Sequence, residues 1–220
     1  MNICSNLDVI KMLDNPLVSR AAFTWRYSSS KLVEPENLST HIYEVLMIGL
    51  MLRDNIMHLT HDQEDIKCEE FLMKAIFHDA DETILGDVPR PLKYASSGIK
   101  EEIDKVAHST ADKLFHTSFK GFNEIRDYYY DAKTGKTGML VRLADMLCVI
   151  KKLRLEVETL NNYTLLDVIP NSINYINDLD VDSTYEVFSC DETKRYLRSL
   201  FKELRVYLAA MHSKYMKEDY

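Results

Sequence analysis

Two side chains that commonly bind divalent metal ions, His78 and Asp79, are adjacent in the sequence and follow an apolar segment over residues 71–77. An imidazole nitrogen and a carboxylate oxygen suit a borderline or hard divalent ion, and a helix that fixes both backbones lowers the entropy cost of assembling a site. A second pair, His61-Asp62, lies in a polar run with no apolar helix before it. The sequence therefore predicts a metal site at the first pair and a solvated loop at the second.

Further metal ligands should come from other apolar segments, because burying an unpaired charge there is costly. His41 begins one apolar run and Asp145 interrupts another. Each has a structural alternative: His41 could be a core histidine with satisfied hydrogen bonds, and Asp145 could pair with Arg142 or Lys151. The presence of all four residues in this order, His41, His78, Asp79 and Asp145, favours the interpretation that they form one divalent-metal site.

Helices are the elements expected to position these side chains. Apolar residues recur at helical spacing, and strand alternation is nowhere sustained. The segments with this spacing are residues 7–13, 42–50, 71–76, 103–114, 140–153 and 197–208. Ser39 is predicted to cap the helix that carries His41, and the segment from about 161 to 187 is predicted to be a looser connection before the last helix. The expected fold class is all-α.

Composition limits the possible classes of protein. A chain of 220 residues with 46% hydrophobic residues suffices for one domain with a substantial core. The net charge of −8 argues against a protein that coats nucleic acid, which needs a clustered basic surface. No apolar run is long enough to span a bilayer and the start of the chain lacks an export signal, so we expect a cytoplasmic protein without a membrane partner. The four cysteines are widely spaced, which argues against a disulfide framework.

Four motifs resemble those of the HD-domain phosphohydrolases, and within them the YfbR-type bacterial 5′-deoxynucleotidases and the related phage deoxynucleoside triphosphohydrolases. The motifs are residues 36–41 (Glu-Asn-Leu-Ser-Thr-His), 78–82 (His-Asp-Ala-Asp-Glu), 86–94 (Gly-Asp-Val-Pro-Arg-Pro-Leu-Lys-Tyr) and 143–148 (Leu-Ala-Asp-Met-Leu-Cys). The third is the most specific, because general HD proteins lack it. One departure is Thr40, where the family usually has Glu before the first metal histidine.

The resemblance implies an HD-domain helical bundle with one extra C-terminal helix. The whole chain, residues 1–220, is then a single domain, with a motif-bearing core over about 20–160 and a C-terminal helical extension over about 161–220. The resemblance also implies subunit association, so we expect a homo-oligomer, with the late helix over residues 196–215 as the natural extra surface.

The resemblance also assigns roles to individual residues. His41, His78, Asp79 and Asp145 are expected to hold one divalent ion, which could be Mn²⁺, Co²⁺, Mg²⁺, Fe²⁺ or Zn²⁺. Glu82 and Asp87 match the carboxylates that orient the attacking water and handle the leaving-group proton, and the division between them stays open.

A second group of matched residues is expected to bind the substrate. Arg26 matches the phosphate-binding arginine, with Arg20 as the competitor if the loop before the first metal histidine carries an insertion. Tyr27 is expected against the sugar, where it could exclude a 2′-hydroxyl, while Trp25 is equally well explained as a core anchor. Lys93 is a candidate for a second phosphate contact.

Three functions remain to be compared. The favoured one is hydrolysis of deoxynucleoside 5′-monophosphates, with a small deoxynucleotide rather than a nucleic-acid polymer as substrate. The alternative is a deoxynucleoside triphosphate triphosphohydrolase, which needs a deeper pocket and extra cations for the β and γ phosphates. The third is a catalytically idle HD domain that senses nucleotides, against which the retained ligands and carboxylates argue. A cyclic-dinucleotide or alarmone hydrolase is disfavoured by the motif over residues 86–94.

Overall fold

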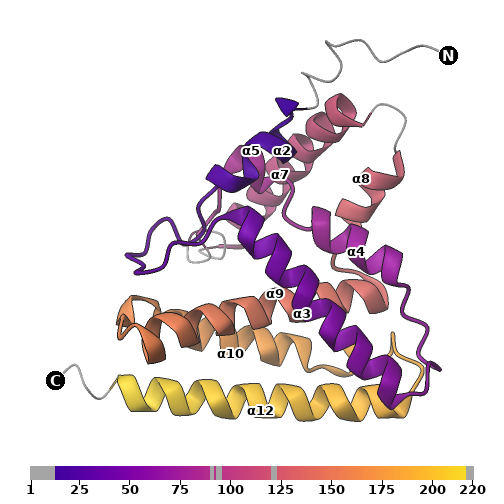
Figure 1. The fold of residues 1–220 in the computed structure, drawn as a ribbon, viewed down its shortest axis with the longest axis vertical. Helices are drawn as coiled ribbons and strands as arrows, with labels where there is room; N and C mark the ends of the chain where they lie inside the picture. Colours follow the sequence, from indigo (N-terminus) through magenta and orange to yellow (C-terminus); the bar gives the residue numbers. More distant parts are fainter. Residues whose placement is uncertain (1–12, 90–91, 93–95, 120–122, 217–220) are drawn as a thin grey trace.

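The described part of the chain is built from helices, as the computed structural model shows (Figure 1). The structure describes residues 13–89, 92, 96–119 and 123–216. Within these ranges the extended structure consists of an isolated bridge between Trp25 and Asn37, with no named strand. The all-α prediction is confirmed.

Helix α9 (Gly135–Arg154) forms the centre of the molecule, between α3 (Leu38–Leu59), α4 (Cys68–Phe77) and α10 (Val168–Leu179). Most of its residues are buried, which is expected for a helix that is apolar nearly all round. The long last helix, α12 (Asp191–Tyr215), lies beside α10 (Figure 1). Because α9 is enclosed on several sides, a polar side chain on it must point into a site or a paired environment.

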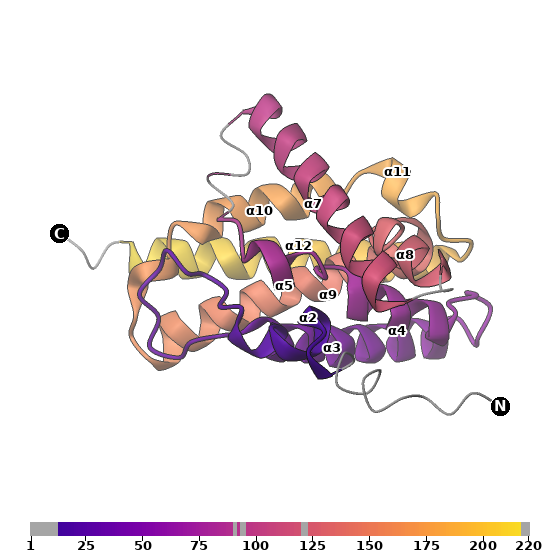
Figure 2. The same cartoon turned by 90° about the horizontal axis from the view of Figure 1, so that it is seen from above.

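Three further helices lie around the end of α4. Helices α5 (Glu82–Leu85), α7 (Ser97–Ser118) and α8 (Asn123–Tyr130) lie on one side of the layer formed by α9, α10 and α12 (Figure 1), and α7 projects away from the rest of the molecule (Figure 2). Helices α4, α7 and α8 share a small second core that contains Phe77, Phe115 and Tyr129. Helix α2 (Pro16–Ser19) and the 3₁₀ turn η1 (Ala21–Phe23) precede α3. This second core fixes the residues that follow α4, including His78 and Asp79.

Two local predictions are wrong. The N-cap of α3 is Asn37 rather than Ser39, because the Asn37 side chain accepts a hydrogen bond from the Thr40 amide at 2.9 Å. The segment 161–187 is not a looser connection, since it contains the 3₁₀ turn η3 (Tyr163–Leu165), α10 and α11 (Asp182–Tyr185). Its many Asn and Asp residues lie on exposed faces, while α10 buries an apolar stripe that includes Ile169 and Ile176.

The loop between η1 and α3 is tied to the core by a buried carboxylate. Glu156, in the π-helical turn η2 (Leu155–Thr159), is fully buried and accepts hydrogen bonds from the backbone amides of Val33 and Glu34, each at 2.9 Å. Lys152 pairs with the same carboxylate at 3.2 Å. These bonds hold the loop that leads from Arg26 to α3. Among the residues that the structure describes, no helix has the length and apolar character to cross a membrane.

Candidate metal centre and flanking pockets

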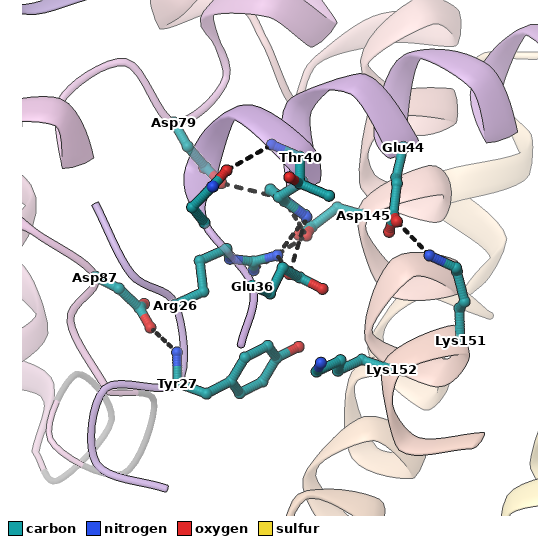
Figure 3. Close-up of polar contacts among 12 residues, drawn as sticks. Arg26, Tyr27, Glu36, Thr40, Glu44, Asp79, Asp87, Asp145, Lys151 and Lys152 are labelled. Carbon is teal, nitrogen blue, oxygen red and sulfur yellow. Dashed lines mark hydrogen bonds and ion pairs between the residues drawn. The ribbon is translucent and has the colours of Figure 1, made fainter. Parts of the chain in front are cut away.

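His41, His78 and Asp145 converge from three helices. His41 lies in the first turn of α3 and is fully buried, His78 directly follows α4, and Asp145 lies in the middle of α9. One potential ligand atom from each lies within 4.8 Å of the others. The close-up in Figure 3 shows Asp79 and Asp145 on the same side of the view as Arg26 and Glu36, which lie next to them. Residues far apart in the sequence thus meet at one buried point.

The geometry of these side chains suits a metal ion. Asp79 Oδ2 lies 2.9 Å from His78 Nε2 and 3.6 Å from His41 Nε2. His78 Nδ1 donates to the Ala75 carbonyl at 2.7 Å, which directs the lone pair of Nε2 into the cluster. Asp145 Oδ1 is buried 3.3 Å from His41 Nε2 and has no hydrogen bond among the described residues. Two imidazoles and two carboxylates, one with an unsatisfied oxygen, fit a divalent cation.

The electrostatics of the cluster point to the same conclusion. Burial alone raises the pKa of Asp79, but the charges of His78 and Lys133 lower this pKa well below its usual range. Burial likewise raises the pKa of Asp145, and nearby His41 lowers it by more. Glu82 shows the opposite outcome, because burial and the charge of Asp79 raise its pKa well above normal. A bound cation relieves this concentration of negative charge.

The structural alternative for Asp145 is wrong. Lys151 pairs with Glu44 on α3, and Arg142 donates from Nε to the Tyr175 hydroxyl at 3.4 Å. Asp145 instead lies 3.8 Å from Nη2 of Arg26. Its carboxylate is therefore directed into the cluster.

Arg26 reaches the cluster from the loop before α3. Its side chain is only 11% exposed, and its Nη1 donates to Glu36 Oε1 at 3.0 Å and contacts His41 Nδ1 (Figure 3). The backbone is held by the Arg26 amide, which donates to the Glu36 carbonyl at 2.9 Å. Arg20 is exposed, on the turn before η1. The structure thus brings Arg26 to the candidate ligands, whereas the Arg20 side chain faces solvent.

Tyr27 occupies a strained backbone position beside Arg26. Its φ of 56° lies in the left-handed region, which costs about 1 kcal/mol or more for a non-glycine residue. The Tyr27 amide donates to Asp87 Oδ2 at 2.7 Å, which holds this conformation (Figure 3). Trp25 is half exposed, so its interpretation as a core anchor is wrong. Lys93 lies outside the described residues.

Two pockets flank the cluster. The Tyr27 pocket is a cavity of about 100 Å³. Its walls are Arg26, Tyr27, Ser29, Ser30, Asp87, Pro89, Val149, Asp167, Val168 and Asn171. The Lys133 pocket, of about 420 Å³, opens onto the candidate ligands. Its walls include His78, Asp79, Glu82, Asp145, Lys100, Lys133, Arg142 and Tyr175. Glu82 shares this pocket with the ligands, whereas Asp87 lies in the Tyr27 pocket.

Several polar residues at the site were not identified from sequence. Glu36, quoted only as part of a motif, is buried with Oε1 3.9 Å from His41 Nδ1, whereas the neighbouring Thr40 is exposed. Lys133 has its Nζ 3.7 Å from Asp79 Oδ1. Their role depends on tertiary proximity, for which the sequence has no signal. The prediction for His61-Asp62 is confirmed, because both residues are exposed in the turn after α3.

Comparisons with known proteins identify the family that the chain matches. Residues 16–188 match a protein family described as 5′-deoxynucleotidase YfbR-like. A 5′-deoxynucleotidase of Cronobacter sakazakii is 29% identical over 153 residues, which cover 68% of this chain and 75% of that protein. A 5′-deoxynucleotidase of Yersinia pestis is 30% identical over 149 residues, which cover 66% of this chain and 74% of that protein.

Solved structures show the same fold. An HD-domain phosphohydrolase of Listeria innocua has a TM-score of 0.70 at 16% identity, covering 93% of this chain and 98% of that one. A protein of Pyrococcus horikoshii has a TM-score of 0.63 at 22% identity, covering 90% of this chain and 98% of that one. At these identities the likeness establishes the fold alone.

Proposed function

The chain belongs to the YfbR-like 5′-deoxynucleotidase family, and we propose that it is a metal-dependent phosphohydrolase that converts deoxynucleoside 5′-monophosphates to deoxynucleosides and phosphate. The observation that carries this proposal is the buried convergence of His41, His78 and Asp145, with the Arg26 guanidinium beside it. A metal site alone does not specify a phosphate ester as substrate. An arginine fork next to the metal does favour one, because it matches phosphate oxygens bidentately.

Four residues are proposed to hold the metal: His41, His78, Asp79 and Asp145. When bound, a divalent ion lowers the pKa of a coordinated water and neutralises phosphoryl charge. His78 is fixed in its ligand orientation by the Ala75 carbonyl, and Asp79 is held beside it. Arg26 would exchange its contact with His41 for contacts with the phosphate oxygens, which would hold the phosphate beside the candidate ligands.

The two remaining carboxylates divide the other tasks. Glu82 lines the same pocket as the ligands and is the proposed general acid, which would give its proton to the departing O5′ oxygen as water attacks phosphorus. Asp87 is a positioning residue, since it holds the strained Tyr27 backbone through the amide. Tyr27 then lies against the deoxyribose and restricts the space for a 2′-hydroxyl.

The test is a phosphate-release assay with dAMP under several divalent metals, combined with metal analysis. Asp145→Ala should lose bound metal and activity together while helical content stays nearly intact, because it removes a ligand. His61→Ala is the matched control, since His61 is an exposed histidine in the second His-Asp pair. An Asp145→Ala protein with full metal content and turnover would exclude the proposed centre.

A second candidate function is hydrolysis of deoxynucleoside triphosphates with release of inorganic triphosphate. The observation that favours it is that Lys100, Lys133 and Arg142 line the Lys133 pocket together with its carboxylates. These cations exceed what one phosphate held by Arg26 requires. Assay of dATP with detection of triphosphate tests this function, and Lys133→Ala should then reduce turnover of dATP more than that of dAMP. A protein that binds but hydrolyses neither nucleotide is the idle sensor.

Location and assembly complete the proposal. We propose a cytoplasmic protein that works as a homo-oligomer on a small deoxynucleotide. The metal is one of Mn²⁺, Co²⁺, Mg²⁺, Fe²⁺ and Zn²⁺, all of which a two-histidine, two-carboxylate site accepts. Fractionation of cells and the metal content of the purified protein test these statements.

A further inference from the structure

We infer that the amino end of α10 recognises the base of the nucleotide, and that Asp167 makes the site prefer bases with an exocyclic amino group. The inference rests on the proposed function, which places the phosphate at Arg26 and the sugar beside Tyr27 and Asp87. These three residues line the Tyr27 pocket together with the start of α10. The base, which follows the sugar in any nucleotide, therefore falls against α10.

The rest of the pocket has the composition of a base site. Val149 of α9, Val168 of α10 and Pro89 offer apolar surface for the faces of an aromatic ring. Asp167 and Asn171 supply hydrogen-bonding groups for its edge. The two are four residues apart at the start of α10, so they lie on the same side of the helix, one turn apart.

The chemistry of these two side chains predicts which bases are preferred. An ionised Asp only accepts hydrogen bonds, and an Asn amide both donates and accepts. Cytosine offers its 4-amino group to Asp167 and its ring N3 to the Asn171 amide group. Uracil and thymine place a carbonyl oxygen where the amino group of cytosine stands, and that oxygen faces the carboxylate without a proton between them. Adenine resembles cytosine in presenting an amino group beside an acceptor nitrogen.

The Asp167 and Asn171 side chains have no other evident structural role in the described part of the chain. Asp167 precedes α10 but makes no side-chain capping hydrogen bond to the helix. Both residues are exposed to solvent on the pocket side, so water competes for their hydrogen bonds. We therefore expect discrimination of about tenfold, at the lower end of the range for such pairs.

The sharpest test compares dCMP with dUMP, because the two share ring size, sugar and phosphate and differ at the edge of the base. The wild-type kcat/KM should favour dCMP by about tenfold. Asp167→Asn should bring the ratio close to one, mainly by improving dUMP, whereas Asn171→Ala should weaken both nucleotides and change the ratio less, because its amide can donate to N3 of cytosine or accept from N3–H of uracil. The matched controls are Asp178→Asn and Asn174→Ala, which make similar changes at exposed positions of α10 outside the pocket and should keep the wild-type ratio.

The outcomes separate this inference from the proposed function. Hydrolysis of both nucleotides at equal rates would overturn the base preference and leave the nucleotidase intact. If neither nucleotide is hydrolysed, the proposed function fails, and the base preference is then tested by calorimetric dissociation constants for dCMP and dUMP. Tighter binding of dCMP that is abolished in Asp167→Asn supports the base preference. Equal binding of the two nucleotides, or no binding, overturns it. A control variant that shifts the ratio as much as Asp167→Asn would also overturn it.

Discussion

Arg26 links the metal cluster to the substrate side of the site at the scale of single residues. It contacts His41, Glu36 and Asp145, and it lines the Tyr27 pocket. We expect Arg26→Lys, which keeps the charge and loses the bidentate fork, to lower kcat/KM for dAMP by at least about tenfold. Arg20→Lys is the control, because Arg20 is exposed, and it should change kcat/KM little. A severe loss in Arg20→Lys with a mild one in Arg26→Lys would reverse the assignment of the phosphate anchor.

Glu82 can be separated from the metal ligands by its kinetic effect. We expect Glu82→Gln to keep metal and nucleotide binding and to lower kcat by about 10²- to 10⁴-fold, the range for a lost general acid or base. The measurements are metal content, the dissociation constant for dAMP and kcat in the same preparations. Loss of metal in this variant would instead make Glu82 a ligand, and an unchanged kcat would make it a bystander in the pocket.

Glu36 is the acceptor that His41 needs when it binds a metal through Nε2. The proton then resides on Nδ1, and once Arg26 has left Nδ1 for the phosphate, Glu36 Oε1, which lies 3.9 Å away in this structure, is the carboxylate placed to move closer and accept it. We expect Glu36→Gln to weaken metal affinity by about 10- to 100-fold, measured by calorimetry. Thr40→Ala should leave the affinity unchanged, because Thr40 is exposed although it precedes His41 in sequence. Equal losses in the two variants would mean that the start of α3, rather than the carboxylate, sets the affinity.

At the scale of elements, the helices that carry the candidate metal ligands could be predicted from the sequence. A charged residue that interrupts a helical repeat of apolar residues is a local signal. His78 at the end of α4 and Asp145 within α9 both stand out in this way. The α10 wall could not be predicted, since Asp167 and Asn171 lie on its exposed side and resemble loop composition. Its helix forms because residues such as Ile176 pack on α9 and α12, and such tertiary support overrides a weak local preference.

The junction between the α3–α4 loop and α12 depends on Glu64. This carboxylate is fully buried and accepts hydrogen bonds from the amide of Ser189 at 3.1 Å and that of Cys190 at 2.9 Å, at the start of α12, while Lys136 pairs with it. Burial alone raises the pKa of Glu64, but Lys136 and these amides lower it from 4.5 to about 2. Because the folded pKa is below the unfolded one, the stabilisation is present above pH 4.5 and is lost as pH falls toward 2.

We expect Glu64→Gln to lower the free energy of unfolding at pH 7 by about 3 kcal/mol, the value of a shift of this size. The difference from wild type should shrink between pH 4.5 and pH 2. Denaturant unfolding at several pH values measures both effects. The control is Asp65→Asn, at an adjacent exposed residue, which should change stability by less than about 0.5 kcal/mol. A constant difference between Glu64→Gln and wild type across this range would exclude the ionised carboxylate as the cause.

At the scale of the whole molecule, the distribution of apolar side chains bears on assembly. The apolar face of α12, including Leu197, Phe201 and Leu208, is buried within the subunit, so an association surface on this helix would have to use its exposed side, where Val206 lies. Helix α3 instead exposes Tyr43, Met47 and Met51, spaced four residues apart on one side. A row of exposed large apolar side chains on one helix is typical of an interaction surface.

We therefore expect the homo-oligomer to form through this side of α3. Met47→Glu places a charge in the middle of the row, and burying it against a second copy is costly, so light scattering after size exclusion should show a shift toward the monomer at micromolar concentration. Val206→Glu is the matched control, because Val206 is an exposed apolar residue on α12. If Val206→Glu dissociates the protein and Met47→Glu does not, the subunits associate through α12. A wild-type protein that is monomeric at all concentrations would contradict the proposed homo-oligomer. In that case turnover of dAMP per subunit should be independent of protein concentration, because the candidate ligands all come from one subunit.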